Sequence, residues 1–285
     1  MSDRLKIILM MTPAMLIVSI LFFGGLFIGF ARSLDYMPVI GLTNPNLEAY
    51  LAAFTSSEVY ASFLLTFHIA FASTVLSSIL AIGAAIILRK PFLGRPVATF
   101  LFQLNLTVPH LVGAIGILYL FSQSGSFARL AYDWHIIAKP GDFPALVFDP
   151  YAIGIILQYV WKEVPFIGVI LLANLQVIGE DYESVARSLG ASRWQAFRHV
   201  LLPLMLPGLL SASAIVFAFT FGAYEIPAIL GQNYPVTLPV LAYRKYTDVD
   251  LGSRPEAMAL SIIIALLSAT MIVLYLRFAR RNMRV

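Results

Sequence analysis

Long apolar runs separated by short polar stretches dominate this chain. Six runs reach the about 20 mostly apolar residues that a helix needs to cross a bilayer. No hydrophilic stretch between them is long enough to fold separately. The pattern predicts an all-α integral membrane protein, with residues 1–285 forming a single transmembrane domain. The expected spans cover approximately residues 7–30, 60–88, 97–121, 151–177, 205–227 and 257–277.

Composition agrees with the hydrophobic pattern. The chain is 60% hydrophobic and 12% charged, with a mean hydropathy of +0.85. Soluble domains are about 45–50% apolar and about 25% charged. A bilayer is therefore the expected solvent. The sequence pI of about 9.3 does not indicate a nucleic-acid partner, because the basic residues stand beside the apolar runs.

The distribution of charge predicts the orientation. If both termini are cytoplasmic, twelve of the nineteen basic residues fall in inside segments and six in outside loops. The acidic residues show the opposite bias. Inside loops are normally enriched in Lys and Arg, so we expect an N-in/C-in topology.

Two long outer loops, residues 31–59 and 122–150, contain scattered Pro, Gly and aromatic residues. Aromatic residues that favour the membrane interface fit short helices lying at that depth. Such loops suit the docking of an external protein, and the alternative is a packed lid without a partner. The aromatic residues are Tyr50, Phe54, Tyr132 and Trp134.

The inner loop at residues 180–203 reads as two short helices around Gly190. Glycine closes helices in a left-handed turn at no steric cost, and Ser192 with Gln195 forms a capping-box pattern for the second helix. Each helix has an apolar face that lipid or a groove on another protein must cover. These faces consist of Tyr182, Val185, Ala186 and Leu189, and then of Trp194, Phe197 and Val200.

The inner loop resembles the "EAA" loop of binding-protein-dependent ABC permeases. That pattern is Glu-Ala-Ala, three residues, Gly, nine residues, Ile, one residue, Leu-Pro. With Gly190 as the glycine, Val200 takes the isoleucine position, and Leu202 and Pro203 follow at the same spacing. The first positions depart from the pattern and hold Ser184, Val185 and Ala186, preceded by Glu183.

The resemblance covers about residues 60–277 and implies the type I ABC importer permease fold, with a peripheral first helix at about 7–30. It implies that the loop is a coupling helix seated in a separate ATPase subunit. The residues expected to make this contact are Glu183, Ser184, Ala186, Arg187, Gly190, Arg193, Trp194 and Pro203, with Arg198 as a further charged contact.

The resemblance also implies the partners and the location. We expect two ATPase subunits, a second and different permease subunit, and a periplasmic binding protein, all at the bacterial inner membrane. The sequence contains no phosphate-binding Gly-x-x-x-x-Gly-Lys-Ser/Thr loop. The chain is therefore expected to be a transport subunit and not an enzyme, without a cofactor of its own, while ATP and Mg bind the partner.

Ionisable residues at membrane depth mark functional sites by default. Lys162 and Glu163 are adjacent in the fourth span and point about 100° apart on a helix, so each needs another partner. Pro165 is expected to free backbone carbonyls nearby. Tyr224 and Glu225 stand near the outer end of the fifth span. All four are candidates for the substrate pathway. For Glu225 the alternative is neutralisation across the bundle, and His68 and His110 read as core histidines.

The acidic residues of the expected outer loops, together with Glu225, favour a small organic cation such as spermidine or putrescine as the substrate. The stretch around Glu225 resembles permeases of the polyamine, iron and thiamine importer group, so Fe(III), thiamine and aminophosphonates stay open. The rival is a secondary transporter driven by an ion gradient, with Glu163 and Glu225 as proton sites. An intramembrane enzyme is disfavoured, because the chain has no cysteine and no His-Glu-x-x-His or Gly-x-Ser-x-Gly motif.

Overall fold

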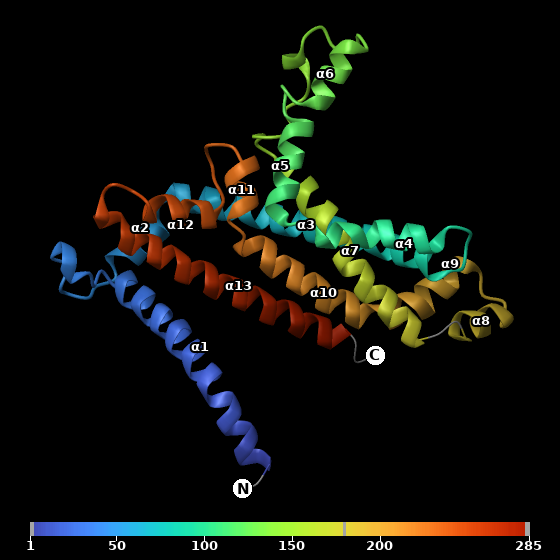
Figure 1. The fold of residues 1–285 in the computed structure, drawn as a ribbon, viewed down its shortest axis with the longest axis horizontal. Helices are drawn as coiled ribbons and strands as arrows, with labels where there is room; N and C mark the ends of the chain where they lie inside the picture. Colours follow the sequence, from blue (N-terminus) through green and yellow to red (C-terminus); the bar gives the residue numbers. More distant parts are fainter. Residues whose placement is uncertain (1–2, 179–180, 283–285) are drawn as a thin grey trace. The chain divides into compact units, whose positions relative to one another are not determined.

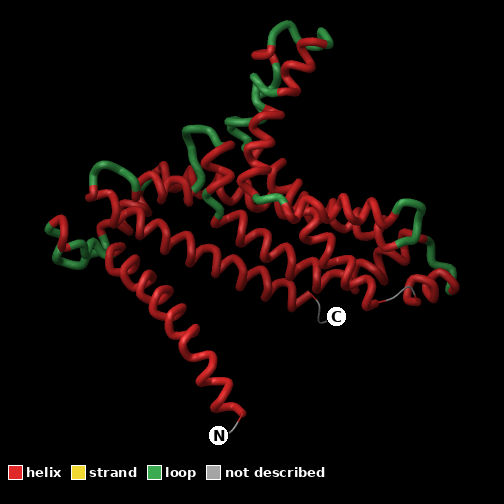
Figure 2. Tube along the Cα trace, in the orientation of Figure 1, coloured by secondary structure: helices red, strands yellow, loops and turns green. Residues whose placement is uncertain are grey.

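The computed structural model describes residues 3–178 and 181–282, and the regular elements in these ranges are helical (Figure 2). The long helices are α1 (Asp3–Ser33), α3 (Ser57–Arg89), α7 (Ile153–Ile178), α10 (Leu202–Gly222) and α13 (Arg254–Asn282). The short helices are α2 (Glu48–Thr55), α4 (Arg95–Leu104), α5 (His110–Phe121), α6 (Ser126–Asp133), α8 (Asp181–Ser188), α9 (Arg193–Ala196), α11 (Glu225–Leu230) and α12 (Leu238–Tyr246).

Six helical stretches are long and apolar enough to cross a membrane: Asp3–Ser33, Ser57–Arg89, His110–Asp133, Ile153–Val177, Arg193–Gly222 and Leu251–Arg277. The predicted all-α fold with six spanning helices is therefore confirmed. The short helices expected in the two long outer loops are present as α2 and α6.

The third predicted span, 97–121, is wrong as a single helix. The chain forms α4, a 3₁₀ turn over Asn105–Thr107 and then α5, and the two helices run in different directions (Figure 1). Pro109 causes this break. It has no N–H to donate, and it forces Val108 into an extended conformation with φ −75° and ψ 126°. The apolar run continues across the break, so hydropathy alone does not reveal it.

The fifth predicted span, 205–227, also has different ends. Helix α10 ends at Gly222, Ala223 is extended, and α11 begins at Glu225. Pro227 cannot donate a hydrogen bond to the Ala223 carbonyl, so α10 cannot continue through it. Glu225 consequently lies in the first turn of a separate short helix.

The chain divides into two units, with boundaries inside α3 and α13. The first contains the described residues up to Tyr60 together with Leu238–Leu266. Within it, the Ser33 hydroxyl lies 2.7 Å from the Tyr50 hydroxyl, joining α1 to α2. Lys245 on α12 forms a 2.8 Å ion pair with Glu256 on α13. The most apolar part of α1 has no buried residue, so this helix presents its whole circumference to lipid or to a partner.

The second unit contains 61–237 and the chain from Leu267. One apolar core joins the C-terminal half of α3 to α7 and α10, with Ile167, Leu171 and Met205 fully buried. Gly208 on α10 lies so close to Asn174 on α7 that a larger residue has no room there. A second apolar core joins α3, α5, α7 and α11 around Tyr159. These two cores hold the inner loop around Gly190 and the polar residues of the spans in place.

Candidate functional site

The first part of the candidate site is the inner-loop segment, which we define as residues 181–203. Helix α8 ends at Ser188, and Gly190 follows with φ +89°. The N–H groups of Gly190 and Ala191 donate to the carbonyls of Arg187 and Ala186. This is the left-handed helix end predicted from the sequence, and glycine adopts it without strain. No atom lies within 4 Å of where a Gly190 side chain would begin, so backbone conformation alone requires glycine here.

The second helix of the segment starts as predicted. The Gln195 N–H donates to the Ser192 hydroxyl at 3.2 Å, and the Ser192 N–H donates to the Gln195 side chain at 2.8 Å. This capping box satisfies N–H groups that the first turn of a helix leaves free. The turn at Gly190 and the capping box together give the loop a defined shape.

The second helix is continuous with the spanning helix α10. Between α9 and α10 the backbone widens into a π-turn over Phe197–Leu201. Pro203 has no N–H for the His199 carbonyl, and it lies in the first turn of α10, where proline is tolerated. Ala196 and Leu201 are buried, which anchors this end of the segment in the core.

The apolar faces predicted for the segment are largely uncovered. Tyr182 and Val185 are each 58% exposed, Leu189 is 83% exposed and Trp194 is 64% exposed. Ala186 is half-buried beside them. Exposed apolar side chains gathered on one rigid motif are typical of a docking surface for lipid or for a protein groove.

Glu183 is held inside the chain. Its carboxylate pairs with Arg89 at the end of α3 and lies 3.7 Å from the Lys90 ammonium. The side chains of Glu183 and Arg89 are only 13% and 9% exposed. Glu183 thus attaches α8 to α3. Sequence reasoning assigned Glu183 to a contact with a partner and did not identify Arg89 as its counter-ion.

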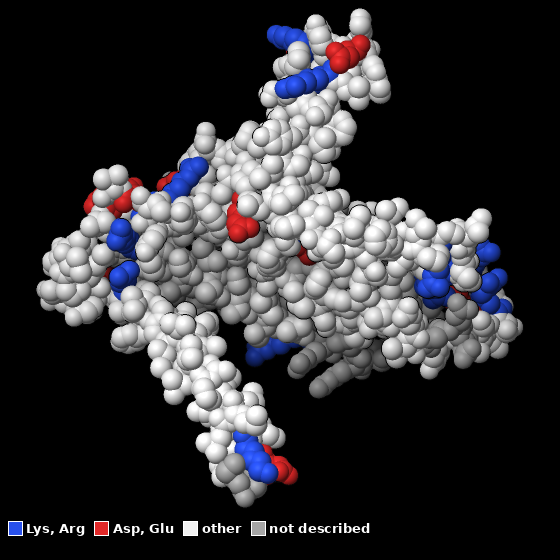
Figure 3. Space-filling view, in the orientation of Figure 1, with Lys and Arg blue, Asp and Glu red and all other residues white. Residues whose placement is uncertain are grey.

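Three other charged residues of the segment, Arg187, Arg193 and Arg198, are exposed, as is Ser184. In Figure 3 Lys and Arg atoms gather at the end of the molecule where Figure 1 places α8 and α9, around a small acidic area. The inner-loop segment thus carries exposed arginines as well as exposed apolar side chains. A complementary partner surface would combine apolar and acidic side chains.

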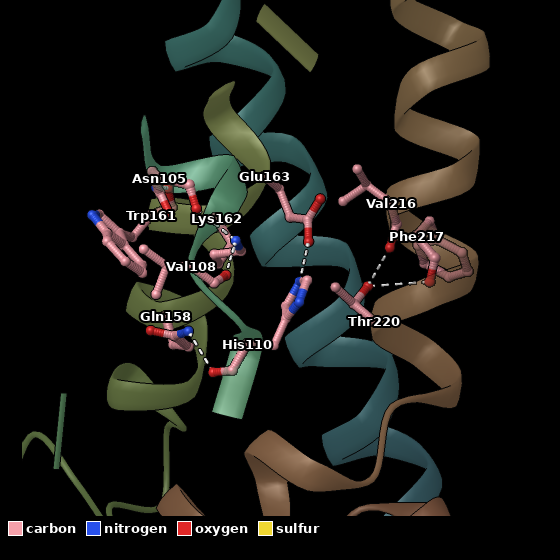
Figure 4. A network of polar contacts seen from close by, with 10 residues as sticks. All are labelled: Asn105, Val108, His110, Gln158, Trp161, Lys162, Glu163, Val216, Phe217 and Thr220. Atoms are coloured by element: carbon pink, nitrogen blue, oxygen red, sulfur yellow. Dashed lines mark hydrogen bonds and ion pairs between the residues drawn. The ribbon is translucent and has the colours of Figure 1, made fainter. Parts of the chain in front are cut away.

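The second part of the candidate site lies within the spans, at the break between α4 and α5 (Figure 4). The Lys162 ammonium is buried and donates to the carbonyls of Asn105 and Val108 at 2.7 and 2.6 Å. Pro109 supplies no N–H to the Asn105 carbonyl, which accepts from the Val108 N–H at 3.1 Å as well as from Lys162. The sequence predicts that Lys162 needs a partner other than Glu163, and these two carbonyls at the α4–α5 break are its partners.

Pro165 frees a carbonyl on α7, as predicted. The Trp161 carbonyl is four residues before Pro165 and therefore receives no helical hydrogen bond. The Asn105 side chain donates to it instead. Asn105 and Lys162 thus join the α4–α5 break to α7 with hydrogen bonds that run in both directions.

Glu163 is buried, and its partner is His110, the first residue of α5, at 3.5 Å. In Figure 4 the two side chains point toward each other between α7 and α10. The His110 ring also lies 4.9 Å from the Phe219 ring on α10. Sequence reasoning read His110 as a core histidine. His110 directly follows Pro109 and begins a helix. This position is the sequence signal that His110 can form a polar contact such as the one with Glu163.

Glu225 and Tyr224 are exposed on the second unit, near the start of α11. Among the described residues Glu225 forms no ion pair, and Lys162, one expected counter-charge, is occupied by carbonyls. His68 lies 3.1 Å from the Tyr151 carbonyl and is apart from this group. Glu225 is thus an exposed carboxylate at the start of α11, just beyond the fifth span, whereas the cluster around Lys162 and Glu163 is buried and largely compensated.

Known proteins resemble this chain over most of its length. A family model described as a binding-protein-dependent transport system inner membrane component matches residues 73–284. The molybdenum transport system permease protein ModB of Mycobacterium tuberculosis is 29% identical over 83% of this chain and 86% of its own length. The sulfate transport system permease protein CysT of Escherichia coli is 26% identical over 85% of this chain and 86% of its own.

The fold also matches a solved structure. A chain from the crystal structure of a bacterial ABC transporter involved in the import of alginate superposes with a TM-score of 0.81. The match covers 98% of this chain and 96% of that chain, at 18% sequence identity. At this identity the match establishes the fold only.

Proposed function

Since the chain belongs to the family of binding-protein-dependent transport system inner membrane components, we propose that it forms half of a substrate pathway powered by a separate ATPase. It is an ABC importer permease of type I fold and a multi-pass membrane transport subunit, not an enzyme. We place both termini on the cytoplasmic side of a bacterial inner membrane, where the inner-loop segment faces the ATPase.

The exposed apolar faces of the inner-loop segment are the observation that carries the proposal. A rigid amphipathic motif can transmit movement to the spans, whereas a flexible loop would absorb it. The turn at Gly190, the capping box and the continuity with α10 supply the rigidity. Leu189 and Trp194 fill the cleft of the ATPase, and Arg187, Arg193 and Arg198 orient the contact.

The proposed assembly contains two ATPase subunits, which bind ATP and Mg, and a second permease of different sequence. One set of spans lines only half of a pathway, and α1, whose most apolar part has no buried residue, offers a surface to that second subunit. A periplasmic binding protein delivers the substrate to the outer loops. Among the solved structures, one is a bacterial alginate ABC transporter in complex with a pentasaccharide-bound periplasmic protein, which shares the fold at a TM-score of 0.82.

Energy coupling distinguishes this proposal from an ion-driven secondary transporter. We expect proteoliposomes containing the permease pair and its ATPase to take up substrate when ATP and the loaded binding protein are supplied. A proton gradient without ATP should give no uptake. The measurement is radiolabelled substrate retained per vesicle. Uptake driven by the gradient alone would support the secondary transporter and contradict the proposal.

For the substrate, we propose a small organic cation of the polyamine type. Lys162 is held by carbonyls and Glu163 by His110, whereas Glu225 is exposed at the start of α11, just beyond the fifth span, and can meet a cation. The names of ModB and CysT favour a second candidate, an oxyanion such as molybdate or sulfate.

Replacing Glu225 separates these two substrate classes. We expect Glu225→Gln to lower spermidine uptake by about tenfold, the effect of losing about 1.4 kcal/mol of charge attraction. Glu48→Gln removes an exposed carboxylate elsewhere and serves as the matched control. Competition with unlabelled thiamine, Fe(III), aminophosphonate, sulfate and molybdate shows which solute is transported. Sulfate or molybdate uptake that persists in Glu225→Gln would establish the second candidate.

A further inference from the structure

A polar pocket lies where the end of α3 meets α8. Its volume is about 480 Å³, and it is lined by Arg89, Lys90, Pro91, Glu183, Ser184 and Arg187. Three of these side chains are cationic and one is anionic. Both Glu183 oxygens are engaged, one with Arg89 and one with Lys90. Arg187 forms no ion pair among the residues that the structure describes. The pocket therefore retains a net positive charge.

Arg89 also has an unused hydrogen-bond donor. Its side chain is only 9% exposed, and its buried Nε–H has no partner in the described part of the chain. A buried donor without an acceptor carries a cost in stability. Glu183 cannot remove this cost, since its carboxylate is already shared between two cations. The exposed Lys90 and Arg187 can together bind a ligand with several anionic oxygens, and Arg89 lines the same pocket.

We propose that the pocket formed by Arg89, Lys90 and Arg187 binds a phosphate group, supplied by an anionic phospholipid headgroup or by free phosphate. Guanidinium groups bind phosphate oxygens through two parallel hydrogen bonds, and a lysine adds a point charge. The tetrahedral group offers separate oxygens to donors that approach from α3 and from α8, whereas a carboxylate offers two oxygens in one plane.

The position of the pocket fits a headgroup. Arg89 is the last residue of a spanning helix, where the apolar run gives way to Lys90 and Pro91. Basic pockets at this depth bind anionic headgroups. A phosphate held there would bridge α3 and α8 and reinforce the attachment that Glu183 makes. The inference rests on the described side chains and on α3 spanning the membrane, and it does not require the proposed coupling to an ATPase.

The test uses the full chain in nanodiscs of phosphatidylcholine with or without phosphatidylglycerol. The double variant Lys90→Gln/Arg187→Gln removes the two exposed pocket cations and leaves the Arg89–Glu183 pair intact. The control Arg193→Gln/Arg198→Gln removes the same charge from the same loop outside the pocket. Native mass spectrometry counts retained phosphatidylglycerol. We expect the affinity to fall by about tenfold or more in the pocket variant, because the charged contacts of Lys90 and Arg187 with the headgroup are lost, and to be retained in the control.

A second arm distinguishes the two sources of phosphate. In phosphatidylcholine nanodiscs, inorganic phosphate is titrated against chloride at equal ionic strength while the thermal unfolding midpoint is followed. If phosphate raises the unfolding midpoint of the wild type and of the control but not that of the pocket variant, free phosphate is a ligand. If phosphatidylglycerol is retained but phosphate does not raise the unfolding midpoint, the ligand is the lipid headgroup. If neither probe binds, or if both double variants lose binding equally, the pocket is not a phosphate site.

Discussion

Replacing Gly190 by valine is expected to abolish most ATP-driven uptake while the protein still inserts into the membrane. Gly190 has a φ of +89°, a region that a β-branched residue adopts only at a cost of about 1–3 kcal/mol. Open space surrounds the position, so the substitution creates strain in the turn without a clash. The turn then shifts, and α8 and α9 present Leu189 and Trp194 in the wrong relative position. We expect uptake to fall by about tenfold or more.

The matched control for this variant is Gly190→Asn. Asparagine adopts the left-handed conformation far more readily than valine, so it should retain most of the uptake although it is similar in size. Uptake in proteoliposomes and membrane insertion by fluorescence-detected size exclusion are measured for both variants. Equal uptake in Gly190→Val and wild type would remove the support for the inner-loop segment as the coupling element. Equal loss in both variants would show that side-chain volume, and not backbone conformation, matters there.

Replacing Lys162 by methionine is expected to give the largest loss of stability. Methionine preserves the length of the side chain but removes the ammonium that binds the Asn105 and Val108 carbonyls. The Asn105 carbonyl keeps the Val108 N–H as a partner, whereas the Val108 carbonyl loses the Lys162 donor, and a buried acceptor left without a partner costs about 1–3 kcal/mol. The expected destabilisation is therefore about 1–3 kcal/mol, a considerable part of the about 5–15 kcal/mol that stabilises a typical domain.

Lys162→Arg is the control, because it keeps the charge and the donors at the same site. Thermal unfolding in detergent, followed by circular dichroism, should show a large decrease of the midpoint for Lys162→Met and a small one for Lys162→Arg. Uptake should follow the same order. If Lys162→Met matched the wild type in stability but lost transport, Lys162 would act on the substrate and not as a support for the α4–α5 break.

Local signals made much of this structure predictable. The six spans follow from apolar length, and the turn at Gly190 and the capping box of Ser192 with Gln195 follow from residue type and spacing. Pro165 indicated a free carbonyl because proline removes a donor at a known position. Each of these inferences needs only residues within about one or two helical turns of each other.

The partners of the polar residues required the folded chain. Glu183 and Arg89 are 94 positions apart, and Glu163 and His110 are 53 apart, so no local pattern joins them. The apolar run over residues 97–121 does not reveal the break before His110, because hydropathy is averaged over many residues and a single proline changes it little. The substrate is not predictable in the same way, since a single exposed carboxylate at Glu225 does not define a ligand.

The two halves of the inner-loop segment are attached to the second unit by different means. From Arg193 to Gly222 the backbone is helical without a gap, so a displacement of Trp194 is transmitted to α10 through helical backbone. Helix α8 is instead fastened sideways, through the ion pair of Glu183 with Arg89. The attachment of α9 to α10 is as stiff as a helix, whereas the attachment of α8 to α3 is as flexible as the two side chains that form it. Movement of Trp194 therefore reaches the spanning helix α10 through the backbone itself, while movement of α8 reaches α3 through the ion pair of Glu183 with Arg89.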